Sequence, residues 1–95
     1  MGWKFPDPPN VAAITTRNIL MGRDWIAFVF HDEDDGGWQF HGPDGFAMDD
    51  AAVVGLGEVW KLDPSIGGVL LSLPLGGRAS RDSNVSPWTI EGTRD

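Results

Sequence analysis

The stretch WIAFVFH, residues 25–31, decides the fold. It is rich in β-branched and aromatic residues and apolar at successive positions, which is typical of a strand covered on both faces. An acidic turn follows at residues 32–37, and WQFH at residues 38–41 then alternates in polarity. The two runs predict an antiparallel hairpin in which residues 25–31 form a central strand. We expect one buried face to carry Phe28, Phe30, Trp38 and Phe40, and Phe30 to be among the costliest positions to truncate.

Outward from this hairpin, other segments predict shorter elements. Residues 11–16 favour a first strand, and residues 17–21 are ambiguous between a helical turn and a bend. Residues 56–62 have apolar positions at helical spacing. Residues 77–82 and 87–91 are candidate late strands joined by an Asp-Ser-Asn turn.

A second helix is predicted from the pair Asp63-Pro64. The aspartate can cap the first amides, and proline in the first turn loses no hydrogen bond. The helix must end by Pro74, and we expect it to run to about Leu73. Its buried residues should be Ile66, Leu70 and Leu73.

The order of these elements predicts an α+β fold, with a small, mostly antiparallel sheet and one or two short helices packed on one face. The 95 residues are enough for one domain, and an apolar fraction of 41% with five Trp and five Phe suits a globular core. Residues 1–10 contain three prolines and are predicted to be an irregular leader. Residues 11–95 are predicted to form the single domain.

Composition argues against several classes of function. The chain has no cysteine, no signal-peptide pattern and no apolar run long enough for a membrane helix, so we expect a cytoplasmic protein. Its net charge is −7 and its seven Lys and Arg are scattered, which disfavours nucleic-acid binding.

No pattern of catalytic or metal-binding residues is complete. An EF-hand register beginning at Asp32 fails at Gly36 and Pro43. His31 and His41 are expected to share a face, but their spacing matches no standard zinc motif. The serines follow no nucleophile motif. We therefore expect no catalytic residues, no cofactor and no metal needed for folding.

Charge segregation is the most unusual feature of the sequence. Between Arg23 and Lys61 there is no Lys or Arg, whereas nine carboxylates occur there. Such a run is a solvated turn, a docking surface for a cationic partner or a cation site. Trp38 is assigned to the core, while Trp88 beside Pro87 is the better candidate for exposure. The predicted partner-binding residues are Asp32, Glu33, Asp34, Asp35, Asp44, Asp49, Asp50 and Trp88.

Several short motifs occur in an order that resembles a bacterial family of toxin immunity proteins. They are Gly37-Trp38-Gln39-Phe40, Met48-Asp49-Asp50, Leu56-x-x-Val59, Asp63-Pro64-Ser65-Ile66, Leu73-Pro74-Leu75-Gly76 and Arg81-Asp82. The family is catalogued as immunity protein 33-like and was earlier a domain of unknown function. The chain departs from it at Leu62, where an aromatic is usual, and in the distinctive segment 83–88.

The resemblance implies an intracellular, non-enzymatic protein that binds and neutralises a cognate toxin. Two alternatives stay open: a stand-alone domain that binds another protein, and a small hydrolase or metal-dependent enzyme. The sequence does not specify the oligomeric state.

Overall fold

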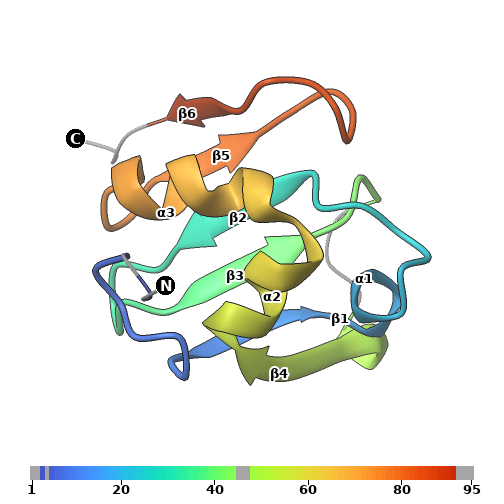
Figure 1. The fold of residues 1–95 in the computed structure, drawn as a ribbon, viewed down its shortest axis with the longest axis horizontal. Coiled ribbons are helices and arrows are strands. Elements are labelled where there is room, and N and C mark those ends of the chain that lie inside the picture. Colours follow the sequence, from blue (N-terminus) through green and yellow to red (C-terminus); the bar gives the residue numbers. More distant parts are fainter. Residues whose placement is uncertain (1–2, 4, 45–47, 92–95) are drawn as a thin grey trace.

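A computed structural model describes residues 3, 5–44 and 48–91 and shows an α+β fold, as predicted (Figure 1). Residues 45–47, and parts of the predicted leader and of the domain's C-terminal end, lie outside this description. The strands are β1 (Ala12–Thr16), β2 (Phe28–His31), β3 (Trp38–His41), β4 (Ala51–Gly55), β5 (Arg78–Ser80) and β6 (Thr89–Glu91). The helices are α1 (Arg17–Leu20), α2 (Leu56–Leu62) and α3 (Gly67–Ser72), with 3₁₀ turns at Met48–Asp50 and Pro64–Ile66.

The six strands form one mixed sheet in the order β4-β1-β3-β2-β5-β6. Four of the five strand pairs are antiparallel, so the predicted antiparallel character is confirmed. The exception is the parallel pair β1–β3, in which Ala13 lies opposite Trp38. Because β1 lies between β3 and β4, the N-terminal strand is interior to the sheet.

The predicted hairpin is confirmed, but its face assignment is wrong. The register pairs Phe28 with His41, Val29 with Phe40, Phe30 with Gln39 and His31 with Trp38. Directly paired residues share a face, so Phe28 and Phe30 lie opposite to Trp38 and Phe40. The segment is apolar at both alternating positions, so its pattern could not fix the face. For the same reason, His31 and His41 lie on opposite faces and do not form the pair that we expected.

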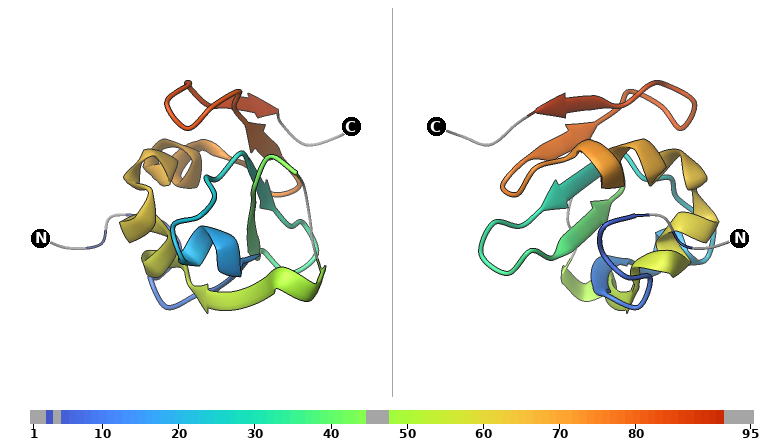
Figure 2. Two further views of the ribbon diagram at one scale, coloured as in Figure 1. Left: turned by 90° about the vertical axis from the view of Figure 1, so that its right-hand side faces the viewer. Right: turned by 60° about the vertical axis from the view of Figure 1, so that its left-hand side comes forward.

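All three α-helices lie on one side of the sheet (Figure 2). We call this side the helix face, and the side that carries Phe28, Phe30, Gln39 and His41 the second face. The core forms on the helix face and includes Trp38, as predicted. Phe28 and Phe30 are only half-buried, so β2 is covered less fully on the second face. The other core residues are Ala13, Ile19, Ile26, Val29, Phe40, Leu56, Val59, Ile66, Val69, Leu70, Leu73 and Ala79.

The helix predicted from Asp63 is confirmed, although it begins as a 3₁₀ turn. The Asp63 carboxylate accepts a hydrogen bond from the Ser65 backbone N–H at 3.1 Å. The chain then continues as α3 and buries Ile66, Leu70 and Leu73, as expected. Gly67 begins α3 where a β-carbon would lie only 3.2 Å from the Phe5 ring. Glycine there permits the N-terminal segment to pack closely against the helix.

Strand β4 was not predicted. Its sequence AAVVG has small residues and no clear alternation, so local pattern gives little signal. In the structure all five residues pair with β1, from Ala12 opposite Gly55 to Thr16 opposite Ala51. Tertiary pairing therefore determines this strand.

The N-terminal leader is irregular in its described part and packs against the domain. The Trp3 and Phe5 rings meet the Trp60 ring at centroid distances of 6.0 and 6.1 Å. The Asp7 carboxylate accepts a hydrogen bond from the Trp38 indole at 2.7 Å. No helix within the described ranges is long and apolar enough to cross a bilayer.

Replacing Thr15 by valine should raise the free energy of unfolding by about 1 kcal/mol. The Thr15 side chain is fully buried, and its hydroxyl has no hydrogen-bond partner within the described ranges. Valine keeps the shape and removes the unsatisfied group. Urea unfolding measures the change. The matched control is Thr16→Val, which should cost about 1 kcal/mol because the Thr16 hydroxyl caps α1 by accepting from the Ile19 N–H at 3.1 Å. A destabilised Thr15→Val variant would contradict this prediction.

Candidate functional site

The predicted acidic residues fall into two groups at opposite ends of β3. Asp32–Asp35 form the turn between β2 and β3, which we call the hairpin tip. Asp44 follows β3, and Asp49 and Asp50 precede β4. The four residues of β3 span roughly 13 Å between the two groups. The predicted surface is therefore not one continuous patch, and whether either group binds a partner stays a prediction.

The group near β4 is partly compensated by α1. The Arg17 guanidinium donates a hydrogen bond to the Asp49 carbonyl at 3.1 Å. The Asn18 backbone N–H donates to the Asp50 carboxylate at 3.3 Å. Arg17 precedes the cation-free part of the sequence, yet folding brings it to this group. Of the carboxylates in this group, that of Asp50 is held by a contact with α1, and the Arg17 guanidinium lies beside the Asp49 backbone.

The hairpin tip borders an open cleft of about 780 Å³. Its floor is a row of residues paired across the second face: Gln39 on β3, Phe30 on β2, Arg78 on β5 and Glu91 on β6. The tip forms one wall, and the glycines that precede β5 line another part. The cleft therefore combines a half-buried aromatic ring with an acidic wall.

Negative charge dominates the cleft. Five carboxylates line it, from Asp32–Asp35 and Glu91, against the single cation Arg78. Arg78 already forms an ion pair with Glu91 at 2.8 Å. Glu33, Asp34 and Asp35 are exposed and form no ion pair with a described residue. An incoming cation would meet carboxylates that no described residue of the chain neutralises.

A hydrogen-bonded chain links the tip to the far end of β3. The Gln39 amide N–H donates to the Asp32 carboxylate at 2.8 Å. Its carbonyl oxygen then faces His41 Nε2 at 3.0 Å, which places the imidazole proton on Nε2. Burial lowers the pKa of His41, and the opposing effect of the Asp32 charge is smaller. His41 is therefore neutral near pH 7.

Lowering the pH from 7.5 to 5 should reduce the free energy of unfolding through His41. Its folded pKa lies below the value of about 6.5 expected in the unfolded chain, so the unfolded state binds more protons. This contribution is fully present above pH 6.5 and falls between pH 6.5 and the lower folded pKa. Urea unfolding at several pH values measures the slope. This part of the pH dependence should vanish in the His41→Asn variant and persist in the His31→Asn variant. If it were lost in His31→Asn and kept in His41→Asn, the assignment to His41 would be wrong.

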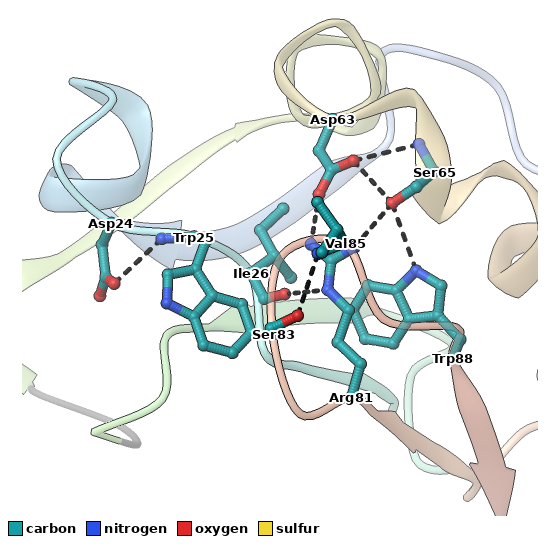
Figure 3. A network of polar contacts seen from close by, with 9 residues as sticks. All are labelled: Asp24, Trp25, Ile26, Asp63, Ser65, Arg81, Ser83, Val85 and Trp88. Atoms are coloured by element: carbon teal, nitrogen blue, oxygen red, sulfur yellow. Dashed lines mark hydrogen bonds and ion pairs between the residues drawn. The ribbon is translucent and has the colours of Figure 1, made fainter.

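A second polar centre, which the sequence did not predict, surrounds Arg81 (Figure 3). The guanidinium donates to the Ile26 carbonyl at 2.8 Å and to the Ser65 hydroxyl at 2.9 Å. It also forms an ion pair with Asp63 at 2.5 Å. The Trp88 ring lies over it at 4.2 Å. Only 1% of the Arg81 side chain is exposed, so this cation is almost completely removed from water.

Trp88, a predicted partner-binding residue, belongs to this centre. It is half-buried, and its indole N–H donates to the Ser65 hydroxyl at 3.3 Å. Its ring covers one side of Arg81, and Trp25 lies on another at 5.8 Å. Trp88 thus stabilises the β5–β6 connection through its contacts with Arg81 and Ser65. This connection lies at the end of β2 opposite to the hairpin tip.

The Arg81 centre is unsuited to nucleophilic catalysis. Burial alone would raise the pKa of Asp63, but hydrogen bonds from Ser65 and Arg81 and the Arg81 charge outweigh it and lower that pKa. A carboxylate with a lowered pKa is a weak general base. The Ser65 hydroxyl already donates to Asp63 at 2.6 Å and accepts from Arg81 and Trp88. Its hydrogen-bonding capacity is used within the centre.

No group of three or more His, Asp or Glu side chains within residues 3, 5–44 and 48–91 is arranged to hold a metal ion. The two histidines that the sequence suggested as zinc ligands lie on opposite faces of the hairpin. We take the hairpin-tip cleft as the candidate site because it combines exposed carboxylates with a half-buried aromatic ring. The Arg81 centre, at the other end of the sheet, holds the structure together.

A function for this chain is inferred from its residues and their arrangement. The chain matches no family model, no curated protein and no solved structure.

Proposed function

We propose that this chain is a protein-binding domain whose docking surface is the hairpin-tip cleft. The observation that carries the proposal is the cleft itself, where five carboxylates face one cation that is already paired. Such a surface attracts a cationic protein and repels nucleic acid.

The floor of the cleft suits a lysine or arginine side chain. The Phe30 ring offers an apolar surface for the aliphatic part of such a side chain. The exposed carboxylates of Glu33, Asp34 and Asp35 can then pair with its charged end. A partner segment with one or more basic residues therefore fits both features of the cleft.

The resemblance to immunity proteins supplies the class of partner. On that basis we propose that the partner is a basic bacterial toxin, which this chain binds and neutralises in the cytoplasm. An acidic surface on an inhibitor speeds the encounter with a cationic enzyme and favours that partner over others. A different cationic protein is the alternative partner. Catalysis by this chain is a separate alternative, which no geometry among the described residues favours.

Neutralising Glu33, Asp34 and Asp35 with Gln, Asn and Asn should slow association by about tenfold at low salt. Asp32 is left in place because it holds Gln39. The probe is the purified product of an adjacent toxin-like gene, and the measurement is the association rate constant. The effect should shrink at physiological salt, where the Debye length is about 8 Å.

The matched pair of variants is Asp34→Asn, Asp35→Asn at the tip and Asp44→Asn, Asp49→Asn at the opposite end of the sheet, where both residues are also exposed. The second variant removes the same charge as the first but should slow association much less. Equal effects of these two double variants would place the docking surface away from the tip without removing the binding function. Failure of the wild type to bind the toxin-like product, and to protect cells that express it, would overturn the toxin assignment.

A further inference from the structure

The connection between β5 and β6 is longer than the sheet requires. It runs over eight residues, 81–88, whereas antiparallel neighbours are usually joined by about two to five. The extra residues project at the end of the sheet opposite to the hairpin tip. Loops of this kind carry binding residues more often than the strands that they join.

This loop is ordered by its own hydrogen bonds. The Ser86 backbone N–H donates to the Ser83 carbonyl at 3.2 Å, and the hydroxyls of Ser83 and Ser86 are 2.8 Å apart. The Val85 backbone N–H donates to the Ser83 hydroxyl at 3.3 Å. These contacts define the turn that carries Val85 at its tip (Figure 3).

The base of the loop is fixed to the body of the protein by the Arg81 centre. Arg81 begins the loop and is bound to Asp63 and to the Ile26 carbonyl. Trp88 ends the loop and lies over the Arg81 guanidinium. Both ends of the loop are therefore tied to the same buried cation, while its turn is held by Ser83.

The fixed loop presents an aliphatic side chain to solvent. Val85 is 87% exposed, more than any other large hydrophobic residue in the described ranges. Its neighbour Asn84 is also exposed, and Asp82 adds the loop's free negative charge, because the Arg81 charge is neutralised by Asp63. A loop that is already ordered loses little conformational entropy when it binds.

We propose that residues 82–88 form a preorganised binding loop, and that Val85 is the anchor that enters an apolar pocket of a protein partner. Ser83 and Trp88 are positioning residues. A projecting loop cannot enclose a small molecule, and one valine beside an aspartate gives little affinity for a membrane. The exposed Asp82 favours a pocket with a cationic rim. This inference does not depend on the hairpin-tip cleft, which lies at the other end of the sheet.

The order of the loop can be tested in the free protein by ¹⁵N relaxation. Backbone order parameters of residues 83–86 should be near 0.85, the value of rigid backbone. Ser83→Ala should lower them toward 0.6 while leaving the thermal midpoint unchanged, because the Ser83 hydroxyl bonds, among the described residues, to other members of the loop. Wild-type values below about 0.6 would overturn the proposal.

The binding role can be tested with a photo-crosslinking amino acid at position 85 in cells, with position 53 as control. Val53 is also a well-exposed valine, but it lies on β4. A protein captured at 85 and not at 53 is then identified, purified and titrated. Val85→Ala should weaken its binding by about tenfold and Ser83→Ala severalfold, whereas Val53→Ala should not change it.

Two results would overturn the binding role: no cross-linked protein at position 85, or unchanged affinity of the purified protein for Val85→Ala. The variant with neutralised Glu33, Asp34 and Asp35 separates this loop from the cleft. If only that variant loses binding, the cleft binds and the loop does not; if only Val85→Ala loses binding, the reverse holds.

Discussion

Replacing Phe40 by alanine should lower the free energy of unfolding by about 3–5 kcal/mol. Phe40 is fully buried at the centre of the sheet, opposite Val29 and stacked near Trp38 at a centroid distance of 6.4 Å. The lost ring leaves a cavity between the sheet and the helices that cover it. Small domains are stable by about 5–15 kcal/mol, so a large share of the stability is removed. Urea unfolding followed by tryptophan fluorescence measures the change.

The control is Phe30→Ala, which removes the same ring from the other face of the hairpin. Phe30 is only half-buried, so its loss should cost clearly less, contrary to the expectation from sequence that Phe30 is among the costliest positions. Equal costs for the two variants would contradict the assignment of the core to the helix face.

Replacing Arg81 by methionine should cost about 3–5 kcal/mol. The change fills similar space but leaves the Asp63 carboxylate without its cation and removes the donor to the Ile26 carbonyl. Removing the cation from a partly buried carboxylate strongly destabilises the folded state. Unfolding in urea at neutral pH measures the loss.

The double variant Arg81→Met, Asp63→Asn should recover part of that loss, because asparagine carries no charge and can still cap the Pro64–Ile66 turn. The single variant Asp63→Asn is measured as well, so that the effect of each substitution alone can be compared with that of the double variant. If the double variant is no more stable than Arg81→Met, the energy lies in the packing of Arg81 against Trp88 and not in the ion pair. In that case Arg81→Lys should be as damaging as Arg81→Met.

Local signals in the sequence were enough for the hairpin, for the helix after Asp63 and for the late strands. Each has a strong local cause: alternation at Trp38-Gln39-Phe40, a capping aspartate before Pro64, and a turn between two short β-rich runs. The sequence has no comparable local signal for which face of β2 is buried, or for the existence of β4. β2 is apolar on both sides, and β4 is a strand only because β1 lies beside it.

Of the residues that line the candidate site, only Asp32–Asp35 were predicted from the sequence, and the floor of the cleft was not. Runs of acidic residues are visible in a sequence, whereas their separation by β3 depends on topology. The burial of Arg81 could not be inferred, because an arginine is buried only when its partners are supplied from elsewhere in the chain. The motifs Asp63-Pro64-Ser65 and Arg81-Asp82 were the available signal, since their residues meet in the fold.

The order in which the ribosome makes the chain gives the Arg81 ion pair a further consequence. Asp63 leaves the ribosome before Arg81, so the nascent chain carries the carboxylate without its counter-ion. β5, which pairs with β2, is also made late. β1 gains its second hydrogen-bonded neighbour only after β4 has been made. Pairings between such distant segments form slowly. Folding of the domain therefore cannot be completed before β5 and Arg81 have been made, and a chain cut short before Arg81 lacks the cation that pairs with Asp63.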